Sequence, residues 1–178
     1  MAGFAVKFLG CKVSQADAML ARSALLAAGH REVPEAEAEL HVINTCCITS
    51  EAESKSRQST RRSLKHAERV LVAGCAVNLD ADRFREIDER VTALVGTADE
   101  VAHRIATEPL DELGGACADL EHDVLWRGAA VDASAPAQAR TRGFVKVQDG
   151  CDCHCAYCII PTVRGGARSR PPSSSSGT

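Results

Sequence analysis

The chain has 178 residues, which is enough for one ordinary core with an appendage and too few for two large domains. Its formal net charge of -3 gives no global indication of nucleic-acid binding, so any basic surface must be local. No apolar run approaches the length of a membrane span, and the run at residues 4–9 is too short for a signal-peptide core. We therefore expect a cytoplasmic protein without membrane contacts. In the reducing environment of the cytoplasm the nine cysteines are unlikely to form disulfides, so metal or redox chemistry is the favoured explanation for them.

Short apolar runs alternate with longer amphipathic ones from the beginning of the chain. Residues 4–9, "FAVKFL", predict a strand. Residues 16–30 predict a helix, with Ser14 as its N-cap and Gly29 as its C-terminal stop. Residues 39–44, "ELHVIN", predict the next strand.

The same alternation continues through the middle of the chain. Ser50 and Glu53 form a capping-box pattern that opens a polar helix, "SEAESKSRQSTRRSLKHA". Residues 69–74 predict a third strand, residues 80–90 a helix and residues 91–96 a fourth strand. Strands separated by single helices imply right-handed crossovers, so the expected fold class is α/β, with a parallel sheet flanked by helices.

The composition changes at about Thr107, where Gly, Ala, Pro and acidic residues replace the periodic pattern. "GFVKVQDG" is a further strand candidate that leads into a group of cysteines, and the final "RPPSSSSGT" has the low complexity of a disordered tail. We expect an N-terminal α/β domain at residues 1–106, a linker at 107–140, the start of a second domain at 141–170 and a tail at 171–178.

Three isolated cysteines, Cys11, Cys46 and Cys75, each stand just past the end of an apolar strand. Because the carboxyl ends of parallel strands meet at one edge of a sheet, we expect the three thiols to converge there, although each could also be an ordinary core residue. Cys47 should face the opposite way from Cys46, which leaves it a poor fourth ligand. A structural zinc site normally closes at four ligands, whereas an iron–sulfur cluster held by three thiolates keeps one iron open. The trio therefore favours a reactive site over a structural one.

Four more cysteines follow the last strand candidate. Cys151, Cys155 and Cys158 have the spacing C-x3-C-x2-C, which differs from the two C-x2-C hooks of a zinc ribbon and from the ferredoxin run. The alternative is a zinc knuckle formed by Cys153, His154, Cys155 and Cys158. Adjacent ligands are hard to wrap around one tetrahedral ion, so we prefer the first interpretation and leave Cys153 as the spare thiol.

This loop, with Tyr157 before its last cysteine, resembles the signature loop of radical S-adenosylmethionine enzymes. The resemblance extends over nearly the whole chain to the radical-SAM methylthiotransferases. It implies an N-terminal domain with a three-cysteine cluster, followed by the first strand and cluster loop of a radical-SAM barrel. The stretches that carry it are "LGCKVSQADA", "VINTCCITSEAESKSRQ", "VLVAGCAV" and "GFVKVQDGCDCHCAYCIIPTVRGGARSRP".

The resemblance implies two [4Fe–4S] clusters with separate tasks, and S-adenosylmethionine as the second cofactor. The cluster at Cys151, Cys155 and Cys158 would bind S-adenosylmethionine next to Tyr157 and reduce it to a 5′-deoxyadenosyl radical, using an electron donor. The cluster at Cys11, Cys46 and Cys75 would carry the sulfur to the substrate carbon.

The short motifs look most like the branch that modifies N6-threonylcarbamoyladenosine next to the tRNA anticodon, with isopentenyladenosine tRNA or a ribosomal protein as alternative substrates. Basic side chains fit an RNA partner through phosphate contacts, although a solvated helix face is the better explanation for any single one of them. The basic residues concerned are Lys55, Arg57, Arg61, Arg62, Lys65, Arg69, Arg164, Arg168 and Arg170.

A radical-SAM barrel requires roughly 200 residues, and the sequence ends about twenty residues after Cys158. We therefore expect a truncated enzyme that does not methylthiolate tRNA by itself. The alternatives are a non-catalytic iron–sulfur or zinc binding module and a small RNA-binding adaptor. The sequence assigns no particular role to Cys47, Cys117 or Cys153.

Overall fold

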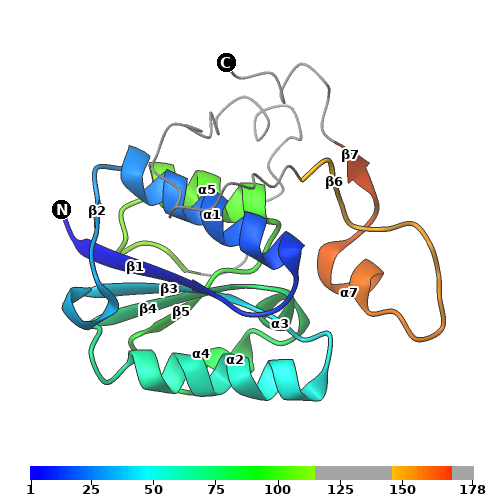
Figure 1. Ribbon diagram of the computed structural model, residues 1–178, viewed down its shortest axis with the longest axis horizontal. Helices are drawn as coiled ribbons and strands as arrows, with labels where there is room; N and C mark the ends of the chain where they lie inside the picture. The colour runs from blue at the N-terminus through cyan, green and yellow to red at the C-terminus, as the bar shows by residue number, and fades with distance from the viewer. Residues whose placement is uncertain (115–145, 170–178) are drawn as a thin grey trace.

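A computed structural model of the chain describes residues 1–114 and 146–169. Its centre is a five-stranded sheet with the order β2-β1-β3-β4-β5, in which every pairing is parallel (Figure 1). The strands are β1 (Gly3–Phe8), β2 (Arg31–Glu32), β3 (Leu40–Thr45), β4 (Arg69–Gly74) and β5 (Val91–Ala93). The helices between them are α1 (Lys12–Ala27), η1 (Glu35–Glu37, a 3-10 turn), α2 (Ser50–Ser63), α3 (Cys75–Leu79), α4 (Asp82–Arg85) and α5 (Ala98–Thr107).

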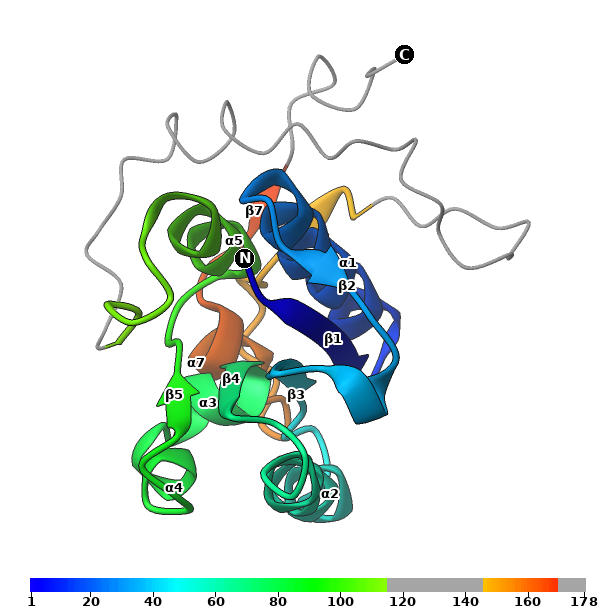
Figure 2. The same ribbon diagram turned by 90° about the vertical axis from the view of Figure 1, so that its left-hand side faces the viewer.

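Helices cover both faces of the sheet, as a parallel sheet requires. Figures 1 and 2 show α1 and α5 on one face and α2 and α4 on the other. The predicted α/β class with a parallel sheet flanked by helices is therefore confirmed. None of the helices within the described ranges has the length and apolar character that crossing a lipid bilayer requires.

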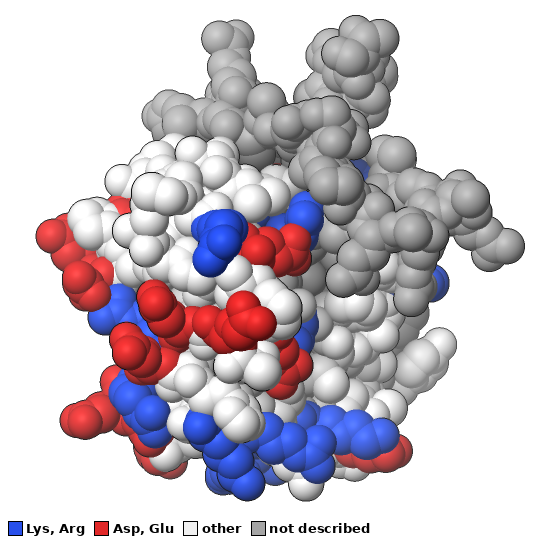
Figure 3. Space-filling model, turned by 60° about the vertical axis from the view of Figure 1, so that its left-hand side comes forward, with Lys and Arg blue, Asp and Glu red and all other residues white. Residues whose placement is uncertain are grey.

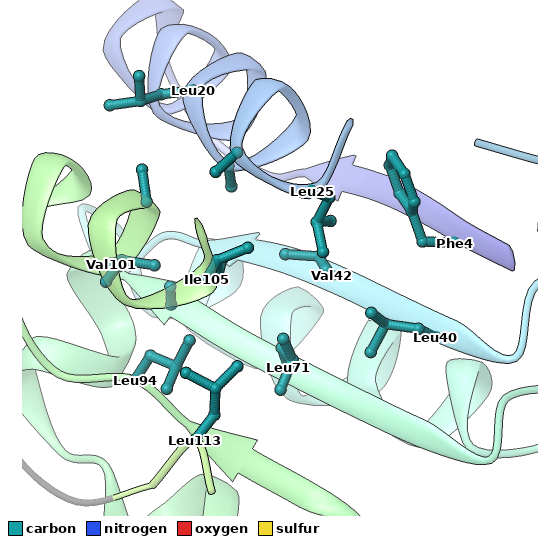
Figure 4. Close-up of a cluster of buried hydrophobic side chains, with 14 residues drawn as sticks. Phe4, Leu20, Leu25, Leu40, Val42, Leu71, Leu94, Val101, Ile105 and Leu113 are labelled. Atoms are coloured by element: carbon teal, nitrogen blue, oxygen red, sulfur yellow. The ribbon is translucent and has the colours of Figure 1, made fainter. Parts of the chain in front are cut away.

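Alternation along the central strands divides the core into two layers. Leu40, Val42 and Leu71 point to the α1 and α5 side, where they join the cluster drawn in Figure 4. Ile43 and Val72 point to the opposite side, toward α2, α3 and α4. Because both faces are covered, β3 and β4 consist almost entirely of buried residues, which is why they read as continuous apolar runs in the sequence.

Helix α1 begins earlier than predicted, at Lys12, because Cys11 and not Ser14 is its N-cap. Cys11 has extended backbone angles, and Ser14 already lies in the first helical turn. Ser14 is buried, and its carbonyl accepts a hydrogen bond of 2.7 Å from the Asn44 amide. The predicted stop holds, since the helix ends at Ala27 and Gly29 takes the left-handed conformation two residues later.

The predicted capping box at the start of α2 is wrong by one residue. The N-cap is Thr49, whose hydroxyl accepts a hydrogen bond of 3.1 Å from the Ala52 N–H, while Ser50 is the first helical residue. The Glu53 side chain does not reach back to the cap, because it accepts a hydrogen bond from Arg57 one turn further along the helix. The Ser-x-x-Glu pattern thus indicated the helix correctly and its boundary incorrectly.

The structure contains two helices that the sequence pattern does not predict, α3 and α5. The helix expected at residues 80–90 is shorter, and α3 precedes it directly after β4. Residues 91–96 form a strand only as far as Ala93. Helix α5 follows, and it begins with a true capping box in which the Thr97 hydroxyl and the Glu100 carboxylate exchange hydrogen bonds with each other's backbone N–H.

The second described segment lies at the carboxyl edge of the sheet. It contains β6 (Gln148–Asp149), α7 (Ile160–Arg164) and β7 (Arg168–Ser169), with β6 and β7 paired antiparallel. Helix α7 contacts α3, and Figure 1 shows it beside the end of the sheet where α1 begins. Most of the expected linker, the start of the strand expected at 143–150 and the expected tail lie outside the described residues.

His41 on β3 should make the stability of the domain depend on pH. The side chain is fully buried, its Nε2 lies 3.0 Å from the Glu35 carbonyl oxygen, and burial lowers its pKa from 6.5. Below pH 6.5, His41 therefore takes up a proton in the unfolded chain, whereas in the folded chain it stays neutral to a lower pH. We expect the free energy of unfolding, measured by urea denaturation under reducing conditions, to fall by up to about 1.4 kcal/mol per pH unit below that value. The variant His41→Gln should lose this part of the slope, and an unchanged slope would contradict the assignment.

Gly74, which joins β4 to α3, should tolerate no side chain. Its φ is +96°, and a Cβ atom would lie 2.3 Å from Asn44 Oδ1 and 2.7 Å from the Thr45 carbonyl oxygen. Gly29 has a similar φ of +84° but open space around it, so Gly29→Ala is a matched control. Both substitutions cost about 1–2 kcal/mol for the left-handed backbone, and Gly74→Ala should cost roughly 1–3 kcal/mol more for the overlap. Equal losses in urea denaturation would show that β3 can move away from this position.

Candidate functional site

Three of the candidate cysteines directly follow a glycine in the left-handed region. Such a glycine lets the chain turn sharply where it leaves a strand, because no Cβ atom obstructs the turn. Two of the three turns lie at the carboxyl edge of the main sheet, and the third follows β6. The pairs are Gly10–Cys11, Gly74–Cys75 and Gly150–Cys151, with glycine φ angles of +112°, +96° and +72°.

Cys46 follows β3 and packs against the turn that carries Cys11. A Cβ atom added to Gly10 would lie 2.8 Å from Cys46 Sγ, so this sulfur fills the space that a side chain at Gly10 would need. The backbone of Cys46 is fixed by Ser56 on α2, whose hydroxyl accepts from the Cys46 N–H at 3.1 Å and donates to the Cys46 carbonyl at 3.2 Å. The glycine is therefore required at position 10 for the two thiol-bearing loops to approach each other.

Cys75 is the first residue of α3, and it is buried. Its Sγ accepts a hydrogen bond of 3.2 Å from Arg164 Nε. Burial raises the pKa of the Cys75 thiol, and the positive charge of Arg164 opposes that rise. The charge of Cys46, which follows the neighbouring strand β3, adds to this rise of the Cys75 pKa.

Cys11 is exposed, and the pKa of its thiol is lowered instead of raised. Partial burial acts to raise its pKa, but hydrogen bonds from the backbone and hydroxyl of Ser14 and from the Val13 N–H outweigh it and hold the pKa below its ordinary value. These donors belong to the first turn of α1, where free N–H groups favour a thiolate. Arg164 also lowers the pKa of Cys11, so one guanidinium acts on both Cys11 and Cys75.

Cys11, Cys46 and Cys75 thus follow three strands whose carboxyl ends lie at the same edge of the sheet, and Cys46 packs against the turn that precedes Cys11. Within the described ranges, no three His, Cys, Asp or Glu side chains meet closely enough to hold one metal ion. Thiolates that bind different irons of a cluster stand farther apart than ligands of a single ion, and soft sulfur donors are those that iron–sulfur clusters use. The three side chains therefore supply the type of donor that such a cluster uses, and their positions do not match the site of a single ion.

Cys47 packs into the core on the α2 side of the sheet. Burial, followed by the charges of Cys75 and Cys46, raises the pKa of its thiol to about 11. Cys75 belongs to the same buried cluster and its pKa is also raised, so burial alone does not distinguish these two thiols as ligands. Cys117 lies outside the described residues.

The second group of cysteines lies on a loop whose ends are tied together. The pairing of β6 with β7 closes it, the Cys151 N–H donates to the Gly165 carbonyl at 3.1 Å, and a Cβ atom at Gly150 would lie 2.0 Å from the Gly166 oxygen. Within this frame Cys155 is exposed to solvent, as is Tyr157 with 94% of its surface. The exposed thiols Cys153 and Cys155 and the half-buried Cys151 and Cys158 lie on one loop at the edge of the sheet.

Sequence reasoning missed a buried network of charges that holds this loop against the N-terminal domain. Arg164 donates to Asp17 and to Asp149, and Lys146 donates to the same two carboxylates. Burial acts to raise the pKa of Asp149, but Lys146 and Arg164 outweigh it and hold that pKa below its ordinary value. An acidic residue on the otherwise apolar face of α1 is the signal that could have revealed Asp17 as half of a buried pair.

The basic residues proposed for RNA contacts fall into different classes. The Arg164 side chain is only 9% exposed and pairs with Asp17 and Asp149, so it is not a surface contact, while Arg170 lies outside the described residues. Lys55, Arg57 and Arg69 pair with acidic side chains. Figure 3 shows lysine and arginine side chains gathered along the lower side of the molecule, where Figure 1 places α2. The exposed basic residues at the end of α2 and just after it are Arg61, Arg62 and Lys65.

Known proteins resemble this chain over most of its length. Residues 3–96 match the uncharacterized protein family UPF0004. The chain is 30% identical to threonylcarbamoyladenosine tRNA methylthiotransferase MtaB of Chlamydia pneumoniae and 31% identical to MtaB of Bacillus subtilis strain 168. These matches cover 94% and 97% of this chain, and 37% and 39% of the relatives.

Ribosomal protein uS12 methylthiotransferase RimO of Gloeobacter violaceus is equally similar, with 32% identity over 96% of this chain and 39% of the relative. The chain thus spans less than two fifths of the length of these curated relatives. The matched region, residues 3–96, contains the parallel sheet together with Cys11, Cys46 and Cys75. The chain therefore belongs to the UPF0004 family, and the relatives that it resembles are methylthiotransferases of these two kinds.

Proposed function

We propose that this chain provides the cluster-binding part of a tRNA methylthiotransferase that inserts a methylthio group at C2 of N6-threonylcarbamoyladenosine, next to the anticodon. S-adenosylmethionine is the second cofactor, and an electron donor reduces the site. One [4Fe–4S] cluster is held by Cys11, Cys46 and Cys75, and the other by Cys151, Cys155 and Cys158.

The observation that carries the proposal is the position of the two cysteine groups. Three thiols from three strand ends lie at one edge of the sheet, and the second loop is docked beside them through the hydrogen bond from Arg164 to Cys75. Two cysteine groups that bound metal independently of each other would need no such contact. An enzyme that moves sulfur to a carbon activated at a second site does need it, because reacting groups must be held in register.

Bound clusters and S-adenosylmethionine would supply one-electron chemistry and a transferable sulfur, neither of which protein side chains provide. The residues of the chain bind and orient. Cys46 and Cys75 are buried and fix the inner side of the first site, whereas Cys11 is exposed and leaves its outer side accessible. Tyr157 on the second loop is exposed, where it is available to a cofactor or to the substrate.

Methylthiolation of a ribosomal protein is the second candidate function. Several relatives are ribosomal protein uS12 methylthiotransferases, at identities between 30% and 33%, and one of them extends over 96% of this chain. The two kinds of relative share the same level of similarity, so the substrate must be decided by experiment.

Substrate and activity are tested together in one assay. The reduced, iron-reconstituted chain is incubated with S-adenosylmethionine, sulfide and tRNA that carries threonylcarbamoyladenosine, alone and with the separately expressed barrel of a relative. We expect the 2-methylthio nucleoside, detected by mass spectrometry of digested RNA, only when the barrel is present. A parallel reaction offers ribosomal protein uS12, and product on the protein but not on the RNA would establish the second candidate.

Two matched cysteine pairs test the ligand assignment through iron content after anaerobic reconstitution. Cys46→Ala and Cys155→Ala should each remove about half of the bound iron, because each removes a ligand of one of two clusters. Cys47→Ala and Cys153→Ala are the neighbouring controls and should leave the iron content unchanged. If Cys46→Ala and Cys47→Ala, or Cys155→Ala and Cys153→Ala, lost the same amount of iron, the ligands of that site would be assigned wrongly.

A further inference from the structure

Four charged side chains form a closed, buried network between the two parts of the site. Arg164 and Lys146 each donate to both Asp17 and Asp149, over distances of 2.7 to 3.1 Å. All four side chains are between 6% and 9% exposed. Two cations and two carboxylates cancel, so the network is electrically neutral and tolerates burial, whereas removal of one member leaves a buried charge without its partner.

Arg164 differs from Lys146 in one contact. Its two terminal nitrogens donate to the carboxylates, and its Nε donates to Cys75 Sγ at 3.2 Å. A guanidinium is planar and directs its N–H groups in fixed directions, so the three acceptors are held in one plane. A lysine ammonium at the same place has no rigid fork with which to reach all three.

The three acceptors belong to parts of the chain that are distant in sequence. Asp17 lies on α1, the helix whose N-cap is Cys11. Asp149 ends β6, two residues before Cys151. Cys75 begins α3. One side chain therefore contacts elements that carry both groups of cysteines.

We propose that Arg164 is a positioning residue that fixes the two cysteine sites relative to each other and, through its Nε–H···Sγ hydrogen bond, raises the reduction potential of a cluster bound at Cys75. The first part concerns the protein alone, and the second rests on the proposed function. A hydrogen bond to a ligating sulfur favours the more negative, reduced form, because it stabilises the added charge.

The metal-free chain tests the first part by amide hydrogen exchange. In Arg164→Gln, we expect exchange in residues 151–158 and in α3 to become at least tenfold faster, because both lose the guanidinium that joins them. Lys146→Gln removes the same charge from the network but no contact with Cys75, so it should loosen residues 151–158 and leave α3 protected. Arg90→Gln, in an exposed pair with Asp88, is the control for a general effect of losing an arginine.

The second part is tested by potentiometry on a chain that also carries Cys151→Ala, Cys155→Ala and Cys158→Ala, so that one cluster remains. Dithionite supplies one electron, the oxidised cluster accepts it, and electron paramagnetic resonance reports the reduced fraction. Arg164→Gln should lower the equilibrium constant for reduction about tenfold, a shift of about 59 mV to more negative potential. Lys146→Gln, which is matched in charge, should shift it much less, and Arg164→Lys should fall between the two.

Equal potential shifts in Arg164→Gln and Lys146→Gln would overturn the role of the hydrogen bond to sulfur, since only charge would then matter. Unchanged exchange in α3 of Arg164→Gln would overturn the positioning role. If the unmodified chain takes up no iron at Cys11, Cys46 and Cys75, the proposed function and the potential effect both fail. The exchange result then decides the positioning role by itself.

Discussion

The level alignment of three parallel strands is the constraint on which the rest of the structure depends. Phe8 at the end of β1 pairs with Asn44, and Thr45 at the end of β3 pairs with Gly74 at the end of β4. Because the strand ends coincide, the residues that follow them emerge together at one edge. A slip of one residue in any pairing would turn the buried side chains of that strand toward the wrong layer, so core packing and thiol placement are fixed by the same register.

The buried charge network adds a second condition, because it is favourable only as a complete set. Burying four charges removes them from water at high cost, and only their mutual hydrogen bonds compensate. Asp17 and Arg164 are separated by 147 residues in the chain, so these bonds form only after the second segment reaches the folded sheet. Docking of the cysteine loop should therefore be cooperative. The same hydrogen bonds that fix the position of the loop also determine whether the loop docks on the N-terminal domain.

The strands could be predicted because their information is local, whereas much of the site could not. Residues 69–74 form a strand as expected, since a continuous run of β-branched and apolar residues is typical of a buried parallel strand. Helix α3 was missed because its start depends on the turn at Gly74, and Ser14 was mistaken for a cap because its real partner, Asn44, lies on another strand. Arg164 was interpreted as a surface residue because its partners, too, are distant in sequence. Nothing close to it in sequence reveals that Cys75 and Asp17 surround it in the fold.

The basic side chains of α2 lie in its last turn, beyond the part of the helix that contacts Cys46. Ser56 in the middle of α2 hydrogen-bonds the Cys46 backbone, and Arg61 and Arg62 follow about 8 Å further along the helix axis. Phosphate contacts there would increase the affinity for any RNA without bringing a particular base to the cysteines. Discrimination between a modified adenosine and a ribosomal protein would require contacts to the base or to the protein substrate itself, which phosphate contacts do not supply. An RNA affinity measured for this chain would by itself not identify its substrate.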